Sequence, residues 1–255
     1  MQFRFRCYRT PFSNAIDALP QDFSNERVHL AIPNPTSIKG TKMLIVHHLG
    51  KSQSERIPWL CEELNIPYEL KLYARDSVTM LAPPEYKALH PIGAAPVIND
   101  GDITLAESGA IMEYILARYG NGRLAPPPNH PDFAPYLYWF HFANGTLQPS
   151  MGRNMILRRL NLPADNPVLL AMKERLERVV NLVEDRLGKA AHFAGAEFTA
   201  ADIIMVFSLT TMRYFLPLDL SPYPNILAYL ARISQRPAHQ MAMQKSDPGM
   251  ALLLT

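Results

Sequence analysis

Residues 43–73 read MLIVHHLGKSQSERIPWLCEELNIPYELKLY and contain three regular elements in succession. The apolar run 43–48 predicts a buried strand, and the alternation over 68–73 predicts a second one. Between them, Ser52 and Glu55 have the spacing of a capping box and apolar residues follow at helical spacing, so a helix is predicted to begin at Ser52. Strand, helix and strand in this order predict two parallel strands joined by a right-handed crossover.

The elements that follow complete this half of the chain. Pro84 predicts the first turn of a short helix, and the Asp100-Gly101 pair predicts a tight β-hairpin. An amphipathic helix is predicted over 107–120, where a glycine ends it. The predicted order is therefore βαβαββα, which is a thioredoxin-like α/β topology.

Four segments follow from this pattern. Residues 1–42 are expected to be a poorly structured N-terminal extension, and residues 43–120 a thioredoxin-like domain. Residues 121–135 are rich in proline, which blocks helix and sheet interiors, and are expected to be a linker. Strand signals then vanish, so residues 136–255 are expected to form an all-helical bundle.

Three local signals support this helical half. Gln148-Pro149 predicts a break in the first helical segment, and Asn166 is placed to cap a long helix. Thr199 and Asp202 have the spacing of a second capping box. These signals predict an all-α architecture for the second half.

The composition excludes several classes of protein. With 48% hydrophobic and 19% charged residues, the 255-residue chain has the make-up of a globular protein. A net charge of +2 does not favour nucleic-acid binding, and no apolar run reaches the length of a membrane span. Cys7 and Cys61 are too few for a disulfide framework or a zinc site, which favours a reducing, cytoplasmic compartment.

The first residues leave two interpretations open. Arg4, Arg6 and Arg9 precede the first acidic residue, Asp17, which is a weak feature of organelle targeting segments. The other interpretation is a loosely packed extension.

Four segments carry a resemblance to a known family. They are HHLGKSQSERIPWLCEELNIPYEL at 47–70, HPIGAAPVIND at 90–100, LAESGAIMEYI at 105–115 and FTAADI at 198–203. Together they resemble the glutathione transferases, in particular theta-like, serine-type members of fungi and bacteria. The resemblance implies glutathione as co-substrate, no permanently bound cofactor and a homodimer.

Ser52 is the predicted catalytic residue. In serine-type members, a serine just before the first helix donates a hydrogen bond to the sulfur of glutathione, and the resemblance places Ser52 there. A hydroxyl at a helix N-terminus can stabilise a thiolate, since the helix dipole also favours negative charge. The alternative is that Ser52 only caps its helix, and Ser54 is the nearest rival for the sulfur contact.

The resemblance also implies residues that bind the peptide part of glutathione. Pro96 is expected to be cis, and Val97 to pair with the cysteinyl unit through its main chain. Glu107 and Ser108 open the third helix, where a carboxylate suits the γ-glutamyl ammonium, and N–H groups with a hydroxyl suit its carboxylate.

The chain departs from the family pattern at one place. Many relatives carry a polar side chain where this sequence has Ala94 and Ala95. Recognition of the glycine end is therefore expected to fall to Lys51, Lys87 or His90.

Residue types that the sequence lacks at particular positions argue against two other kinds of chemistry, thiol oxidoreduction and metal binding. The loop after the first strand has no cysteine, which argues against thiol oxidoreduction by the protein itself. His47 and His48 should point to opposite faces of a strand, so they cannot chelate one metal together, and no metal site is expected. Cys61 lies on the apolar stripe of its helix and is expected to be a core residue.

The predicted function is conjugation of the glutathione thiolate to small apolar electrophiles. The acceptor pocket is expected to be lined by Leu49, Tyr138, Phe142 and Phe215. The alternatives are a glutathione-dependent peroxidase or isomerase using the same thiolate, and a glutathione-binding regulatory module without turnover.

Overall fold

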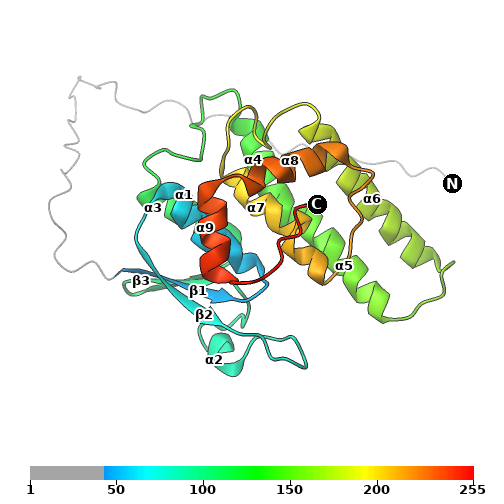
Figure 1. Cartoon of the computed structure of the whole chain (residues 1–255), viewed down its shortest axis with the longest axis horizontal. Coiled ribbons are helices and arrows are strands. Elements are labelled where there is room, and N and C mark those ends of the chain that lie inside the picture. Colours follow the sequence, from blue (N-terminus) through cyan, green and yellow to red (C-terminus); the bar gives the residue numbers. More distant parts are fainter. Residues whose placement is uncertain (1–42) are drawn as a thin grey trace, which may run out of the picture. The chain divides into compact units, whose positions relative to one another are not determined.

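The computed structural model describes residues 43–255, so the predictions made for residues 1–42 lie outside the described residues. A four-stranded sheet has the order β2-β1-β3-β4 (Figure 1). β1 and β2 are parallel, whereas β1–β3 and β3–β4 are antiparallel. The strands are β1 Leu44–Leu49, β2 Tyr68–Tyr73, β3 Val97–Asp100 and β4 Ile103–Ala106. The predicted thioredoxin-like topology is confirmed.

The register of the sheet follows the hydrophobic pattern. Val46 in the central strand is fully buried and pairs with Leu70 on one side and Ile98 on the other. The hairpin closes where Asp100 pairs with Ile103, and Gly101 has a φ of 61°, a conformation that glycine adopts without steric cost. The sequence therefore predicted both the parallel pair and the turn.

Helices cover both sides of this sheet. A 3₁₀ turn over Gln53–Glu55 leads into α1 (Arg56–Leu64), which lies with α3 (Ser108–Tyr119) on one side, while α2 (Pro84–Lys87) lies on the other (Figure 1). α1 ends at Asn65, which is in the left-handed conformation (φ 49°).

The second half is helical throughout, as predicted. Its elements are α4 Phe133–Phe142, the π-helical segment Ala143–Leu147, α5 Gln148–Arg159, α6 Pro167–Leu187, α7 Ala200–Leu209, the 3₁₀ turn Thr211–Tyr214, α8 Pro224–Ser234 and α9 Pro237–Ser246. The predicted break appears as the π-helical segment, with Pro149 in the first turn of α5. The Asn166 side chain accepts hydrogen bonds from Val168 N–H and Leu169 N–H, which confirms its capping role. None of the helices described for residues 43–255 is long and apolar enough to cross a membrane.

The hydrophobic core is continuous between the two halves. Every residue of α7 is buried, and α7 packs against α1, α3 and α4. Trp59 of α1 and Ile111 of α3 belong to the same buried cluster as α7. Leu49, which lines the cavity described below, belongs to a second, smaller cluster with Tyr86, Val97 and Ala106.

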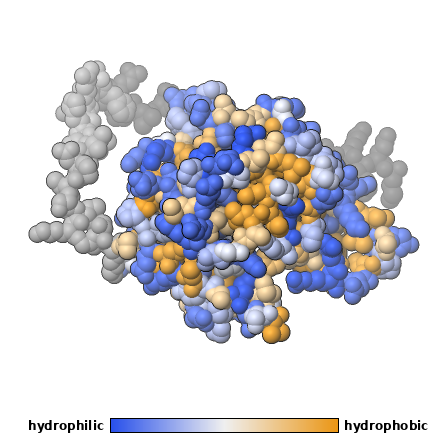
Figure 2. Space-filling model, in the orientation of Figure 1, coloured by the Kyte–Doolittle hydropathy of each residue, from blue (hydrophilic) through white to orange (hydrophobic). Residues whose placement is uncertain are grey.

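α9 has no counterpart in the sequence-based prediction. It lies along α1, where Trp59 and His239 stack edge to face at 4.7 Å and Arg236 pairs with Glu63 at 2.7 Å. The chain end follows, with Arg213 donating hydrogen bonds to the main-chain oxygens of Leu253 and Thr255. Hydrophobic residues gather near the centre of this face, where Figure 1 marks the C-terminus (Figure 2). Asp247, directly after α9, accepts a hydrogen bond from Lys51 N–H, so α9 brings the chain back to the loop that follows β1.

Candidate active site

A cavity of about 410 Å³ lies beside the loop that follows β1, against α5 and α7. Four residues singled out in the sequence line it: Leu49, Lys51, Ser52 and Phe215. These residues come from both halves of the chain, so the cavity is built between the sheet and the helical bundle.

Ser52 is held at the mouth of the first helix. It has an extended backbone (φ −138°, ψ 166°) and its Oγ accepts a hydrogen bond from Ser54 N–H at 3.2 Å. The Ser52 side chain therefore caps the turn and also lines the cavity, so the two roles weighed from the sequence are compatible.

Ser54, the other candidate for the sulfur contact, is separated from the cavity by Ser52. It is fully buried, its Oγ accepts a hydrogen bond from Leu49 N–H at 3.1 Å, and it does not line the cavity. The Oγ atoms of Ser52 and Ser54 are 2.6 Å apart. The geometry therefore favours Ser52 for direct contact with a ligand.

The predicted capping box between Ser52 and Glu55 is wrong. The Ser52 hydroxyl bonds to Ser54 N–H, and the Glu55 side chain turns away to accept a hydrogen bond from Thr211 Oγ1 at 2.6 Å. Burial raises the pKa of Glu55 to about 8, although the Thr211 hydrogen bond works against this shift. Thr211 lies in the helical half, 156 positions after Glu55, so local sequence rules do not predict this contact.

Arg56 joins the two halves beneath the cavity. Its guanidinium is fully buried and donates hydrogen bonds to Gln53 Oε1, Ser108 Oγ, Asn144 Oδ1 and Gln148 Oε1 at 2.9–3.1 Å. Burial lowers the pKa of Arg56 to about 9, and the neighbouring Glu55 opposes this shift when it is ionised. Gln53 and Gln148 line the cavity, so Arg56 fixes the orientation of two amides that face a ligand.

The peptide bond between Ala95 and Pro96 is cis, as expected from the resemblance. The expectation for Val97 needs correction, because Val97 is paired within the sheet, is 1% exposed and does not line the cavity. Ala95 lines it instead, and its carbonyl accepts a hydrogen bond from Gln53 Nε2 at 2.7 Å. Of these two residues, Ala95 lines the cavity and Val97 does not.

Glu107 and Ser108 lie next to the cavity rather than in its lining. The Ser108 hydroxyl is buried and accepts hydrogen bonds from Arg56 and from Asn144 Nδ2. Glu107 is exposed and has a φ of 71°, a strained conformation for a residue with a side chain. Backbone strain of this kind is typical of functional positions.

The three residues predicted to bind the glycine end of glutathione differ in whether they line the cavity. Lys51 lines the cavity, and its Nζ lies 5.2 Å from the centre of the Tyr214 ring. His90 is outside the lining and its Nδ1 accepts a hydrogen bond from Ile92 N–H. Lys87 is exposed on α2 and is also outside the lining. Position therefore favours Lys51.

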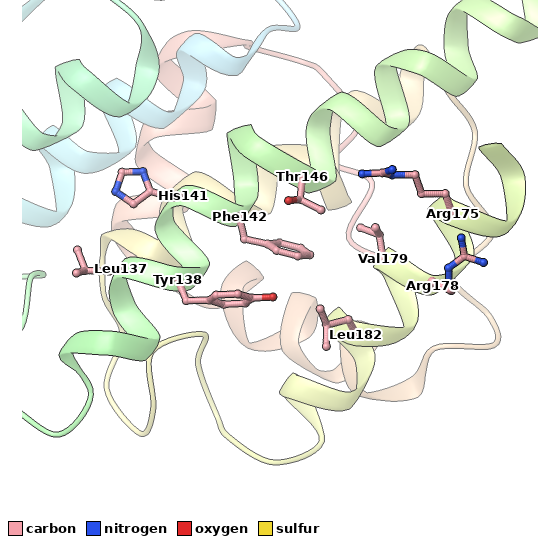
Figure 3. Close-up of a pocket in the computed structure, with 9 residues that line it drawn as sticks. All are labelled: Leu137, Tyr138, His141, Phe142, Thr146, Arg175, Arg178, Val179 and Leu182. Carbon is pink, nitrogen blue, oxygen red and sulfur yellow. The ribbon is translucent and has the colours of Figure 1, made fainter. Parts of the chain in front are cut away.

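Tyr138 and Phe142 do not lie with Leu49 and Phe215, contrary to expectation. Their rings, 5.6 Å apart, line a separate hollow of about 810 Å³ between α4 and α6 (Figure 3). They point toward Val179 and Leu182 of α6 in this view, because this side of α4 faces α6 and not the sheet.

Other side chains supply the apolar surface of the cavity. The larger apolar residues that line it besides Leu49 and Phe215 are Met80, Leu81, Met155, Phe207 and Met212. Methionine side chains are flexible, so this wall can adapt to ligands of different shape.

Polar residues important for the site were also missed from the sequence. Arg75 lines the cavity and donates a hydrogen bond to the Gly50 carbonyl at 2.8 Å. Gln53 and Gln148 line it as well. Asp247 accepts a hydrogen bond from Lys51 N–H at 3.0 Å, although 196 positions separate them. No local pattern in the sequence marks these residues, because tertiary contacts bring them together.

The two adjacent histidines face opposite sides of β1, as predicted. His47 contacts the Tyr73 hydroxyl at 2.9 Å and Asn99 Oδ1 at 2.8 Å, whereas His48 points into the protein. Within residues 43–255, no group of three His, Cys, Asp or Glu side chains could hold a metal ion. Cys61 is a fully buried core residue, as expected, and burial raises the pKa of its thiol.

Comparison with known proteins identifies the family. Residues 41–117 match the model of the glutathione S-transferase N-terminal domain, and residues 131–237 match that of the C-terminal domain. The chain belongs to the glutathione S-transferase family.

Individual relatives are consistent with this assignment. Glutathione S-transferase 3 of Schizosaccharomyces pombe is 32% identical, over 84% of this chain and 92% of the relative. Glutathione S-transferase GstB of Escherichia coli K12 is 28% identical, over 69% and 86% of the two chains. The crystal structure of a glutathione S-transferase from Actinobacillus pleuropneumoniae superimposes with a TM-score of 0.75 at 31% identity, covering 83% of this chain and 99% of that one.

Proposed function

We propose that this chain is a theta-like, serine-type glutathione transferase in which the Ser52 hydroxyl holds the glutathione thiolate. The observation that carries the proposal is the position of Ser52, which lines the cavity at the N-terminal end of the first helix. A hydroxyl donor and the helix dipole both favour a sulfur anion there. Lowering a thiol pKa by two units corresponds to about 2.7 kcal/mol, which one charge-assisted hydrogen bond and the dipole can supply.

The remaining polar groups fit the peptide part of glutathione. The main chain of Ala95 and the amides of Gln53 and Gln148 would bind the cysteinyl unit. Glu107 and Ser108 would bind the γ-glutamyl end, with Ser108 oriented by the buried guanidinium beneath it.

The apolar wall favours a hydrophobic electrophile as second substrate. Leu49, Phe207 and Phe215 face the same cavity as Ser52, so an apolar acceptor would lie beside the sulfur. A glutathione-dependent peroxidase would use the same thiolate, and a regulatory module would bind glutathione without turnover. Comparing an aryl halide with an organic hydroperoxide as second substrate distinguishes the three functions.

The test of the catalytic role is a pH titration of bound glutathione by ultraviolet absorbance of the thiolate. In the wild type we expect a thiol pKa at least one unit below that of free glutathione, and in Ser52→Ala a return of about one to two units. Ser234→Ala, which removes a hydroxyl at the end of α8, is the matched control and should titrate like the wild type. An unshifted thiol pKa in the wild type would refute the enzymatic proposal.

Two further properties are proposed. A homodimer is expected for this family, and the apolar hollow between α4 and α6 is a candidate contact surface. A cytoplasmic location is expected from the cysteine content.

A further inference from the structure

A series of four buried side chains runs from the cavity to the chain end. Ser52 Oγ lies 2.6 Å from Ser54 Oγ, which lies 3.0 Å from His48 Nδ1. His48 Nε2 lies 3.0 Å from Asp247 Oδ2. His48 is fully buried and the Asp247 side chain is 8% exposed. The series therefore connects the ligand-facing hydroxyl to a buried imidazole and carboxylate.

The ionised state of Asp247 determines the direction of these hydrogen bonds. Burial works to raise its pKa, but the contacts with His48 and with the N–H and charge of Lys51 outweigh burial and hold the pKa below its ordinary value. Asp247 is therefore a carboxylate at neutral pH, and His48 Nε2 must carry a hydrogen to donate to it. In neutral His48, Nδ1 is then a bare acceptor.

The direction continues through the two serines. Ser54 accepts a hydrogen bond from Leu49 N–H, and its own hydrogen has two acceptors within reach, His48 Nδ1 at 3.0 Å and the Leu49 carbonyl at 3.4 Å. With that hydrogen in the shorter contact, to His48, Ser52 is the donor in the 2.6 Å contact with Ser54. Ser52 also accepts a hydrogen bond from Ser54 N–H. Its remaining lone pair is available to a ligand in the cavity, and that lone pair can accept the hydrogen of a thiol.

We propose that His48, positioned by Asp247, is the base that takes the thiol proton of glutathione through Ser54 and Ser52. This inference rests on the proposed function and goes further by naming where the proton goes. A serine hydroxyl is too weak a base to remove that proton by itself at neutral pH, whereas an imidazole can accept it.

The transfer balances as a shift of three protons. The thiol proton moves to Ser52 Oγ, the Ser52 proton moves to Ser54 Oγ, and the Ser54 proton moves to His48 Nδ1. The sulfur becomes a thiolate that accepts a hydrogen bond from Ser52, and His48 becomes an imidazolium paired with the Asp247 carboxylate. After the conjugate leaves, the proton returns along the same series to water in the cavity.

Other charged groups act on this pair. Lys51 and the half-buried Arg75 add positive charge near Asp247, which stabilises its ionised form. Glu55 interacts electrostatically with Asp247, and its raised pKa of about 8 keeps it largely protonated at neutral pH, so it does not compete with Asp247 for the proton on His48. Among the described residues, Asp247 is therefore the carboxylate that pairs with the His48 imidazole.

The first experiment measures the thiol pKa of bound glutathione in Asp247→Asn and His48→Gln. We expect each variant to raise it by about one unit, which is a tenfold lower thiolate fraction at a pH below both values. Asp247→Asn keeps an oxygen for Lys51 N–H but places an amide NH2 opposite His48 Nε2, so it removes both the charge and the acceptor of the His48 hydrogen. Glu63→Gln is the matched control, since Glu63 pairs with Arg236 where α9 docks on α1 but does not touch the series.

The outcomes separate the relay from a structural role of Asp247. If loosening of α9 were the cause, Glu63→Gln would raise the thiol pKa as much as Asp247→Asn, and the relay would be rejected. An unchanged thiol pKa in both relay variants would reject it as well.

A second measurement is made on the wild type, and a variant is needed only to assign the His48 signals. Nitrogen-15 chemical shifts of the histidine side chains should show His48 protonated only at Nε2 in the free protein, and at both nitrogens when bound glutathione is a thiolate. A neutral His48 beside a thiolate would overturn the proposal while leaving Ser52 in its role. A wild type that leaves the thiol pKa unshifted would instead refute the proposed function itself.

Discussion

Glu55 shows how one residue can match a local motif and yet serve a distant contact. Its spacing from Ser52 fits a capping box, but its carboxyl lies fully buried against Thr211. Because burial disfavours the ionised form, the folded protein holds a proton that the unfolded chain releases.

Glu55 should therefore make stability depend on pH. Between pH 4.5 and about 8 the unfolded residue is ionised while the folded one stays protonated. The folded state binds more protons in that window, so the free energy of unfolding falls as pH rises, by at most about 1.4 kcal/mol per pH unit. Glu55→Gln keeps an acceptor for Thr211 and should remove this decline.

Chemical denaturation of the wild type and Glu55→Gln at several pH values from 5 to about 8.5 checks the effect. Glu174→Gln, on the exposed face of α6, is the control and should follow the wild type. Parallel curves for the wild type and Glu55→Gln would show that Glu55 ionises normally in the folded protein.

At the scale of elements, the stability of α7 depends on the hydrogen bonds of its first turn. The capping box predicted from the sequence is present, with Asp202 accepting a hydrogen bond from Thr199 N–H at 2.8 Å. Asp202 also accepts from Phe193 N–H and from the Tyr229 hydroxyl, at 3.0 and 3.1 Å. One carboxylate therefore links the start of α7 to α8 and to the loop before α7.

Asp202→Ala should destabilise the protein more than an ordinary lost cap. The substitution leaves four donors without their acceptor, namely the N–H groups of Phe193 and Thr199 and the hydroxyls of Thr199 and Tyr229. We expect a loss of about 3 kcal/mol in the free energy of unfolding. Asp219→Ala, which removes an exposed acceptor of Ser221, should cost about 1 kcal/mol or less. Denaturant titration of both variants measures the difference, and equal losses would contradict the role assigned to Asp202.

At the scale of the whole molecule, the apolar hollow between α4 and α6 lies away from the candidate active site. Tyr138 and Leu182 are 52% and 41% exposed there, with Arg175 and Arg178 at its edge (Figure 3). Exposed apolar patches on this scale are typical of surfaces that bind another protein. A second copy of the chain is the proposed occupant.

Tyr138→Glu should place an unpaired charge in that contact and convert a dimer into monomers. Analytical ultracentrifugation measures the mass, and Leu160→Glu, at an exposed apolar residue just after α5, is the control that should leave it unchanged. A wild-type monomer at micromolar concentration, or a dimeric Tyr138→Glu, would remove this surface from the proposal.

The sequence was sufficient wherever a structure depends on near neighbours. Hydrophobic period and turn residues predicted all four strands, the Asp100-Gly101 hairpin and the caps at Asn166 and Thr199, because these features involve residues a few positions apart. Resemblance added the position of Ser52, which stays a prediction as the catalytic residue. The bounds of the two domains and the role of residues 1–42 also stay predictions.

Only the tertiary structure determined which distant side chains surround Ser52. Ala95 lines the cavity in place of Val97, because Val97 is buried in the sheet. Tyr138 lies against α6, because that side of α4 does not face the sheet. Asp247 reached His48, 199 positions away, because α9 docks on α1. Contacts of this kind depend on how whole elements pack, and packing is set by the shape of a shared core rather than by spacing along the chain.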